Sequence, residues 1–190
     1  MSRMAAAGPR LRPMHKGGAM AGPALTVKVR PGDNLMLHRA LDLAEPGDVI
    51  VVDAGGDLTT AIMGDLMLAH AKQRGVAGLV INGAVRDVDS IRAQELPLYA
   101  AGVTHRGPYK DGPGEINVPV SVGGMVVHPG DIIVGDEDGV VAVPLAEAEA
   151  LLKVCAATRQ REDATLSEIR AGSVDRAWVD ALLKSRGFAG

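Results

Sequence analysis

The sequence predicts an α/β fold in which mixed sheets are flanked by helices. Two apolar runs, Val49–Asp53 and residues 77–81, alternate with stretches in which apolar residues recur at helical spacing. The first run has no polar interruption, which is typical of a strand covered on both faces. Between residues 118 and 143, short strands are separated by Gly-Gly, Pro-Gly-Asp and Asp-Glu-Asp-Gly turns, which indicate antiparallel pairing. We therefore expect one domain with both kinds of strand.

The first half of the chain shows five elements in order. Residues 25–30 alternate between apolar and polar side chains, as a half-buried strand does. Gly75 is well placed as the C-terminal cap of a helix. The expected elements are a strand at 25–30, a helix at 35–44, a strand at Val49–Asp53, a helix at 61–74 and a strand at 77–81.

The second half is expected to contain a loop of functional interest, residues 102–115, which is rich in glycine, proline and charge and too long for a plain hairpin. The expected elements around it are a helix at 88–96, strands at 98–101, 118–122, Met125–Val127, 131–134 and 139–143, and helices at 145–170 and 175–184. We interpret residues 1–190 as a single domain. Its first 23 residues form a loop-rich segment and residues 145–190 a helical C-terminal extension.

Composition excludes several classes of protein. The net charge is −3 without a basic block, and the chain has only one Phe, one Trp and two Tyr, so we expect no nucleic acid as partner. The only cysteine, Cys155, rules out an internal disulfide and is expected to pack on an apolar helix face. No segment approaches the roughly 18–20 apolar residues of a membrane span, and residues 1–23 lack the apolar run of a signal peptide. We therefore expect a cytoplasmic protein without a membrane partner.

Other kinds of site have weak support in the sequence. Gly55-Gly56 follows a strand, but the G-x-G-x-x-G fingerprint of dinucleotide-binding proteins is missing, so a tight turn is the better interpretation. Asp57 is expected to cap the helix that follows. The five histidines show no ligand spacing and no motif of a phosphohistidine carrier, and no serine lies in a nucleophile elbow.

The strongest candidate site joins two short motifs, Gly64-Asp65-Leu66-Met67 and Gly83-Ala84-Val85-Arg86-Asp87. The first opens a helix, whose unpaired backbone N–H groups can bind an anion. In the second, Arg86 offers a planar fork to a carboxylate and Asp87 offers hard oxygen atoms to a divalent cation. Taken alone, Asp65 can be a solvated acid, and Arg86 and Asp87 can cap a helix or form structural ion pairs. Together they suit a small oxo acid bound with a metal.

Six segments appear in a recognisable order. They are Gly47-Asp48-Val49-Ile50-Val51-Val52-Asp53, Gly64-Asp65-Leu66-Met67, Gly75-Val76-Ala77-Gly78-Leu79-Val80-Ile81, Gly83-Ala84-Val85-Arg86-Asp87, Val127-His128-Pro129-Gly130-Asp131 and Gly135-Asp136-Glu137-Asp138-Gly139-Val140. On these segments, residues 17–144 resemble the RraA-like family. The enzymatic members of that family are 4-hydroxy-4-methyl-2-oxoglutarate/4-carboxy-4-hydroxy-2-oxoadipate aldolases. Family members usually begin with a further helical segment before the position of Met4. We therefore expect either a misassigned first methionine or a missing segment.

The resemblance implies a domain of the swivelling β/β/α type that forms homotrimers or hexamers, with active sites between subunits. It implies that residues 64–67 supply backbone donors to the substrate and that Arg86 binds the substrate carboxylate. Asp87 is then the protein ligand of a divalent cation, Mg²⁺ or Mn²⁺, and Asp65 is an acid close to the metal-bound waters. A C-terminal acid of a neighbouring subunit, Glu162 or Glu168, is a further candidate.

The expected function is a metal-dependent, class II-type pyruvate aldolase with oxaloacetate decarboxylase side activity. Its substrate is expected to be 4-hydroxy-4-methyl-2-oxoglutarate or a related 4-hydroxy-2-oxo acid, with Asp65 and Arg86 as the catalytic residues. The alternative is a non-catalytic regulator of the ribonuclease E type, which other family members represent. In the archetypal regulator the residue after the arginine is not aspartate, so Asp87 favours the enzyme.

Overall fold

A mixed β-sheet forms the centre of the first of two units in the chain. The computed structural model describes residues 5–188 and divides the chain into Met1–Ala146 and Glu147–Gly190. The elements of the first unit are β1 (Arg12–Pro13), β2 (Met20–Val29), α1 (Leu35–Leu43), β3 (Val49–Asp53), β4 (Ala61–Met63), α2 (Asp65–Gln73), β5 (Gly78–Val85), α3 (Val88–Ala93), β6 (Leu98–Val103), β7 (Gly114–Ile116), β8 (Val120–Val122), β9 (Met125–Val127), β10 (Ile132–Gly135) and β11 (Val140–Val143). The mixed α/β class predicted from the sequence is confirmed.

The sheet combines a parallel half and an antiparallel half that share one strand. Strands β2, β3, β5 and β6 run parallel, whereas β10 and β11 add antiparallel strands beyond β2. Within β2, residues 20–23 pair with β10, and the pairing with β3 begins at Ala24. Pro23, which has no N–H to donate, lies where the strand changes partners.

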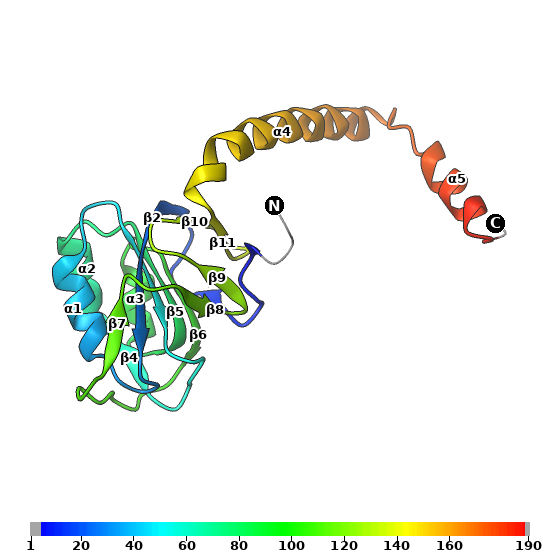
Figure 1. Ribbon diagram of the computed structural model, residues 1–190. Helices are drawn as coiled ribbons and strands as arrows, with labels where there is room; N and C mark the ends of the chain where they lie inside the picture. The colour runs from blue at the N-terminus through cyan, green and yellow to red at the C-terminus, as the bar shows by residue number, and fades with distance from the viewer. Residues whose placement is uncertain (1–4, 189–190) are drawn as a thin grey trace. The chain divides into compact units, whose positions relative to one another are not determined.

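Two apolar clusters pack on opposite faces of this sheet (Figure 1). Ile50 and Val52 of β3 face the cluster that includes the buried residues of α1, α2 and α3, whereas Val49 and Val51 face the cluster of β8, β9, β10 and β11. Because successive side chains of a strand point to opposite faces, a strand between two cores must be apolar at every position. This arrangement explains the uninterrupted apolar run of β3. The central sheet is covered by the three helices on one face and by the β8–β9 hairpin on the other.

The segment before α2 differs from the sequence prediction. Residues 61–63 were expected to begin a helix, but they form the buried strand β4, which pairs in parallel with β5. The N–H of Ala61 donates to the carbonyl of Arg106 at 2.8 Å, so the strand lies between β5 and a distant loop. Tertiary pairing thus overrides the local helical pattern, and α2 begins only after Gly64.

The predicted C-terminal cap of α2 is confirmed. Gly75 adopts φ +73°, a left-handed conformation that favours glycine. Its N–H donates to the carbonyl of Lys72 at 3.0 Å, and the N–H of Val76 donates to that of Ala71 at 3.2 Å. This pair of bonds is the Schellman motif, which satisfies carbonyls that a helix end leaves free.

Residues 1–23 contain more structure than the expected loop. Within the described part of this segment, β1 pairs with β6, and β2 begins at Met20 instead of near residue 25. The pairing with β10 accounts for the earlier start, because it gives residues 20–23 an antiparallel partner that local patterning does not show.

The second unit consists of α4 (Ala148–Ala171) and α5 (Ala177–Ser185), preceded by a 3₁₀ turn at Leu145–Glu147. Neither helix buries a residue. Cys155 is therefore exposed, and the expectation that it packs on an apolar face is wrong. No helix within residues 5–188 combines the length and hydropathy needed to cross a bilayer.

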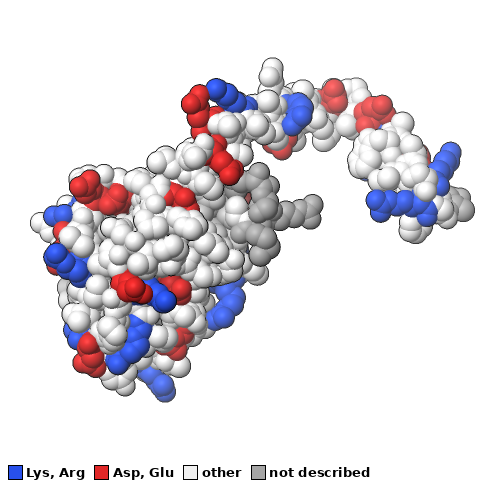
Figure 2. Space-filling view, viewed as in Figure 1, with Lys and Arg blue, Asp and Glu red and all other residues white. Residues whose placement is uncertain are grey.

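Positive and negative side chains are interspersed over the face of the molecule shown in Figure 2. No extended patch of one sign covers this face. A protein that binds the phosphate backbone of nucleic acids generally gathers its lysines and arginines on one face. This face therefore offers no such surface.

Candidate active site

Gly64 joins β4 to α2 and allows an unusually close approach of two side chains. Its backbone is extended, with φ −149° and ψ −166°, so the conformation itself does not require glycine. A Cβ at this position, however, would collide with Oδ2 of Asp87 and would lie 3.1 Å from both Cγ and Nε of Arg86. Glycine is therefore needed here because the Arg86-Asp87 turn packs directly against the start of α2.

Asp87 lies between β5 and α3 in the left-handed region, with φ +60° and ψ +41°. For a residue with a side chain this conformation costs on the order of 1 kcal/mol, although aspartate tolerates it better than most. Its carboxylate forms no capping bond to α3. Instead, Oδ2 accepts the N–H of Asp65 at 3.1 Å and lies 3.6 Å from Nε of Arg86. Asp87 thus caps α2, and the two motifs singled out in the sequence are in direct contact.

The first amides of α2 already interact with carboxylates. The N–H of Asp65 binds Asp87, and the N–H of Leu66 donates to Oδ1 of Asp65 at 2.7 Å. Both interactions are favourable because the N-terminus of a helix attracts negative charge. The chain's own carboxylates therefore already serve as acceptors for these two amide groups.

A small pocket of about 110 Å³ opens beside these groups. Its lining includes five of the six predicted site residues, namely Gly64, Asp65, Leu66, Met67 and Arg86. Asp87 lines an adjacent depression, which it shares with Arg86, Asp89, Thr104 and His105. Pockets for drug-sized ligands span roughly 300–1,000 Å³, so this pocket suits a smaller molecule.

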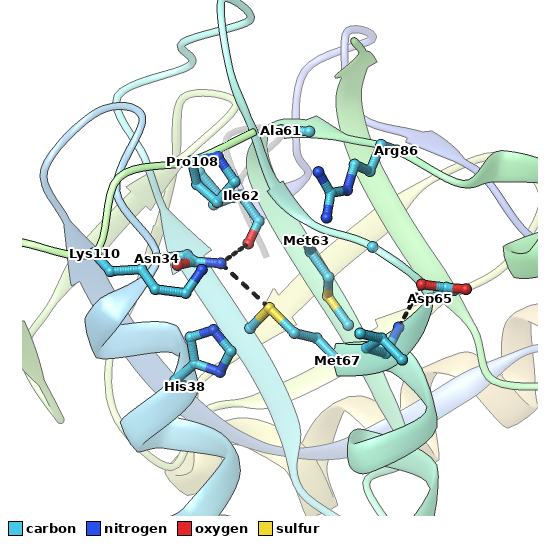
Figure 3. A pocket seen from close by; sticks show the side chains of 12 residues that line it. Asn34, His38, Ala61, Ile62, Met63, Asp65, Met67, Arg86, Pro108 and Lys110 are labelled. Carbon is cyan, nitrogen blue, oxygen red and sulfur yellow. Dashed lines mark hydrogen bonds between the residues drawn. The ribbon is translucent and has the colours of Figure 1, made fainter. Parts of the chain in front are cut away.

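The opposite wall of the pocket consists of residues that the sequence analysis missed. Figure 3 shows Asn34, His38 and Lys110 across the pocket from Arg86 and Asp65. Asn34 precedes α1, His38 lies one turn into that helix, and Lys110 belongs to the long loop. The loop was flagged by its length, but nothing in the sequence indicated that it meets the start of α1.

Two features of this wall suit a polar ligand. Asn34 is 3% exposed and donates from Nδ2 to the carbonyl of Ile62 at 3.0 Å and to Sδ of Met67 at 3.4 Å. Its Oδ1 is buried without a hydrogen-bond partner among the described residues. Burial lowers the pKa of His38, and the positive charge of Lys110 lowers it further, so the ring is mostly neutral at pH 7. The pocket is therefore lined by two positive charges, Arg86 and Lys110, and one negative charge, Asp65.

The residues at the site fit a weakly held divalent cation. Within residues 5–188, no group of three or more His, Cys, Asp or Glu side chains is placed to hold a metal. Asp87 offers a partly exposed carboxylate whose Oδ1 accepts no hydrogen bond from the described residues. Mg²⁺ often binds through one or two carboxylates and keeps several waters, so this donor set is sufficient for such an ion.

The acids at the end of β3 and just after it, Asp53 and Asp57, have structural roles. Asp57 was expected to cap a helix, but the element that follows it is the strand β4. Its carboxylate instead binds the hydroxyl groups of Thr59 and Thr60, at 2.8 Å for the shorter bond to Thr59. Asp53 accepts the N–H groups of Gly55 and Ser121. These contacts support the interpretation of the Gly55-Gly56 segment as a tight turn.

Comparisons with known proteins agree on one family. The family model RraA-like, described as Aldolase/RraA, matches residues 1–142. A curated protein of Halalkalibacterium halodurans, named "Putative 4-hydroxy-4-methyl-2-oxoglutarate aldolase", is 46% identical over 143 residues, which are 75% of this chain and 68% of that protein.

Solved structures show the same fold. The RNA-processing inhibitor RraA from Thermus thermophilus matches with a TM-score of 0.69 and 34% identity, covering 73% of this chain and 84% of that one. RraAS2 from Streptomyces coelicolor, described as an unusual member of the RNase ES inhibitor RraA protein family, matches with a TM-score of 0.76 and 30% identity. That match covers 87% of this chain and 85% of the other. The similar proteins thus include both aldolase and inhibitor names.

Proposed function

Because the chain belongs to the RraA-like family, we propose that it is a divalent-metal-dependent pyruvate aldolase. Its substrate is 4-hydroxy-4-methyl-2-oxoglutarate or a related 4-hydroxy-2-oxo acid, and it also decarboxylates oxaloacetate. The aldolase name of a relative at 46% identity supports this proposal. The observation on which it depends most is the packing of Arg86 and Asp87 against the start of α2, beside a pocket of small volume.

Arg86 binds the C1 carboxylate of the substrate in this proposal. Its side chain lines the pocket and is 43% exposed, so a carboxylate can reach it. The planar fork of arginine matches the two oxygen atoms of a carboxylate. Lys110, on the opposite wall, supplies a second positive charge for the carboxylate at the other end of the substrate. The absence of a Cβ at Gly64 lets Arg86 and Asp87 pack closely against the start of α2.

Asp87 would hold the cation through its partly exposed carboxylate. When bound, a divalent cation supplies a Lewis acid for the negative charge that develops on the C2 oxygen during cleavage. The left-handed turn at Asp87 and the bond to the N–H of Asp65 orient the carboxylate. This preorganisation reduces the rearrangement needed in the transition state.

Asp65 orients the water that receives the proton of the C4 hydroxyl. As that proton leaves, the C3–C4 bond breaks and its electron pair forms the pyruvate enolate, while C4 becomes a carbonyl. A proton delivered to C3 then completes pyruvate. Oxaloacetate loses CO₂ from C3 and gives the same enolate, so the groups that bind C1 and C2 serve both reactions.

A coupled pyruvate assay tests the proposal. Purified protein is incubated with oxaloacetate and a panel of 4-hydroxy-2-oxo acids, with Mg²⁺, with Mn²⁺ and with EDTA. We expect pyruvate release that requires the cation. Lack of release from every substrate in the presence of both metals would contradict an enzymatic function.

A second candidate function is a non-catalytic regulator of the ribonuclease E type, because solved structures of similar proteins are described as RNA-processing inhibitors. Asp87 favours the enzyme, since in the archetypal regulator the residue after the arginine is not aspartate. A protein that inhibits ribonuclease E in vitro but releases no pyruvate would favour this second function.

We further propose that the protein acts as a homotrimer or hexamer. Neither α4 nor α5 buries a residue within the described chain, although Trp178, Leu182 and Leu183 of α5 are apolar and exposed. Exposed apolar surface of this kind is typical of protein–protein contacts. Glu162 and Glu168 of α4 are candidates for completing a neighbouring active site in such an assembly.

A further inference from the structure

Asp33 connects the two segments that form the far wall of the pocket. Its side chain is 1% exposed, although it is charged and lies just before α1. Oδ1 accepts the N–H of Leu35 at 2.9 Å, and Oδ2 accepts the N–H groups of Asp111 at 2.7 Å and Gly112 at 3.0 Å. One buried carboxylate thus holds both the start of α1 and a loop that lies 78 residues further along the chain.

The carboxylate is held in its charged form. Burial raises the pKa of Asp33, but the three backbone N–H donors and the guanidinium of Arg30 outweigh it, and the pKa lies below its ordinary value. Arg30 lies 3.5 Å from the carboxylates of both Asp33 and Asp111, with its guanidinium over the ring of Tyr109. Hydrogen bonds to a charged acceptor are roughly twice as strong as neutral ones. The connection is therefore a strong one.

These contacts fix the backbone on both sides of Lys110. Before it, the N–H of Tyr109 donates to the carbonyl of Gly32 at 2.9 Å, and the carbonyl of Tyr109 accepts the N–H of Asn34 at 3.0 Å. After it, the N–H of Asp111 binds Asp33. Lys110 itself is exposed and lines the pocket. The position of its ammonium group therefore depends on the hydrogen bonds that restrain the backbone of Tyr109 and Asp111.

We propose that Asp33 is a positioning residue that makes the site selective for 2-oxo acids with a second carboxylate, and that it acts through Lys110. The proposal rests on the proposed function, because it takes the pocket to be the substrate site. Arg86 binds the carboxylate next to the oxo group, and Lys110, across the pocket, binds the distant carboxylate. The distance between the two charges is set by the hold of Asp33 on the loop.

Binding of two stable probes measures this selectivity without any catalysis. The dissociation constants of 2-oxoglutarate, which has two carboxylates, and pyruvate, which has one, are measured by calorimetry in the presence of Mg²⁺. In Asp33→Ala we expect the constant for 2-oxoglutarate to rise about tenfold, corresponding to loss of one charge-assisted contact, and that for pyruvate to change less than about twofold. Asp33→Asn keeps part of the hydrogen bonding and gives an intermediate effect, and it serves as the test if the alanine variant does not fold.

Asp131→Asn is the matched control. Asp131 is also a buried acid, 8% exposed, and accepts the backbone N–H of His128 at 2.8 Å in a turn whose residues do not line the pocket. Its loss should lower stability without changing the ratio of the two constants. If Asp33 acts through Lys110, adding Asp33→Asn to the Lys110→Ala variant should not change the ratio of the two dissociation constants any further. The effects of the two substitutions are then not additive.

The outcomes separate this inference from the proposed function. An unchanged ratio in Asp33→Ala and Asp33→Asn, or equal ratios in Asp33→Asn and Asp131→Asn, overturns the inference even if the wild-type protein cleaves its substrate. If the Asp33 variants shift the ratio but the wild-type protein releases no pyruvate, the inference is supported and the enzymatic function is contradicted. A wild-type protein that binds 2-oxoglutarate no more tightly than pyruvate also overturns the inference.

Discussion

Replacement of Gly64 by alanine should separate activity from stability. The new methyl group fits the extended backbone, but it would overlap Oδ2 of Asp87 and come within 3.1 Å of Arg86. Both side chains are more than a third exposed, so they can move away at little cost to folding. A displacement of about 1 Å at reacting groups costs roughly a hundredfold in rate, or about 2.7 kcal/mol of transition-state stabilisation.

The expected change in stability is much smaller. The variant loses the exposed hydrogen bond from the N–H of Asp65 to Asp87, worth about 1 kcal/mol, while alanine restricts the unfolded chain and recovers about 0.4–1 kcal/mol. Pyruvate release and thermal unfolding are measured on the same preparation. We expect kcat/KM to fall about a hundredfold while the free energy of unfolding changes by less than about 1 kcal/mol.

Gly107→Ala is the matched control. A Cβ at Gly107 would lie 3.5 Å from Nη1 of Arg86, which is an ordinary van der Waals contact. This variant should keep activity within about a factor of two, since it displaces neither site residue. If Gly64→Ala were folded and as active as Gly107→Ala, the close packing of the Arg86-Asp87 turn against α2 would have no role in the reaction, and the reasoning would be refuted.

Four further predictions concern the site and the assembly. Arg86→Lys should lower kcat/KM by roughly ten- to a hundredfold, because an ammonium group does not reproduce a bidentate contact; unchanged kinetics would make Arg86 structural. Chelation with EDTA should abolish pyruvate release and Mg²⁺ or Mn²⁺ should restore it, because one carboxylate holds a cation weakly; full activity after exhaustive chelation argues against a metal. Asp87→Ala should abolish both aldol cleavage and oxaloacetate decarboxylation, whereas Asp65→Ala should impair cleavage more, since decarboxylation removes no hydroxyl proton; equal losses in Asp65→Ala contradict its assigned role. Light scattering at micromolar concentration should give the mass of a trimer or hexamer, and a monomer would exclude active sites shared between subunits.

The sequence predicts those parts of the fold and site that depend on local chemistry. The strand Val49–Asp53 and the cap at Gly75 follow from side-chain pattern and backbone preference, and both are confirmed. The Gly64 and Arg86 motifs were expected to serve one site together, and the structure brings them into direct contact. Local pattern is sufficient in these cases, since each element is defined by its own residues.

Long-range packing determines what the sequence analysis missed. Residues 61–63 look helical until β5 and the loop at Arg106 provide strand partners. The wall formed by Asn34, His38 and Lys110 depends on the hold of Asp33 on a distant loop. Such contacts leave no periodic signal in the sequence, because the residues involved are far apart and of different types.

Strand β2, which both halves of the sheet share, affects how the chain folds while it is being synthesised on the ribosome. Residues 34–110, which supply the pocket, are synthesised before β10, the partner of the first half of β2. A nascent chain can therefore build its ligand pocket while residues 20–23 still present an open edge to their surroundings. Open edges of this kind invite pairing with other chains, and contacts between distant residues form slowly. Until residues 132–135 emerge, this edge of β2 lacks its partner and is open to pairing with other chains.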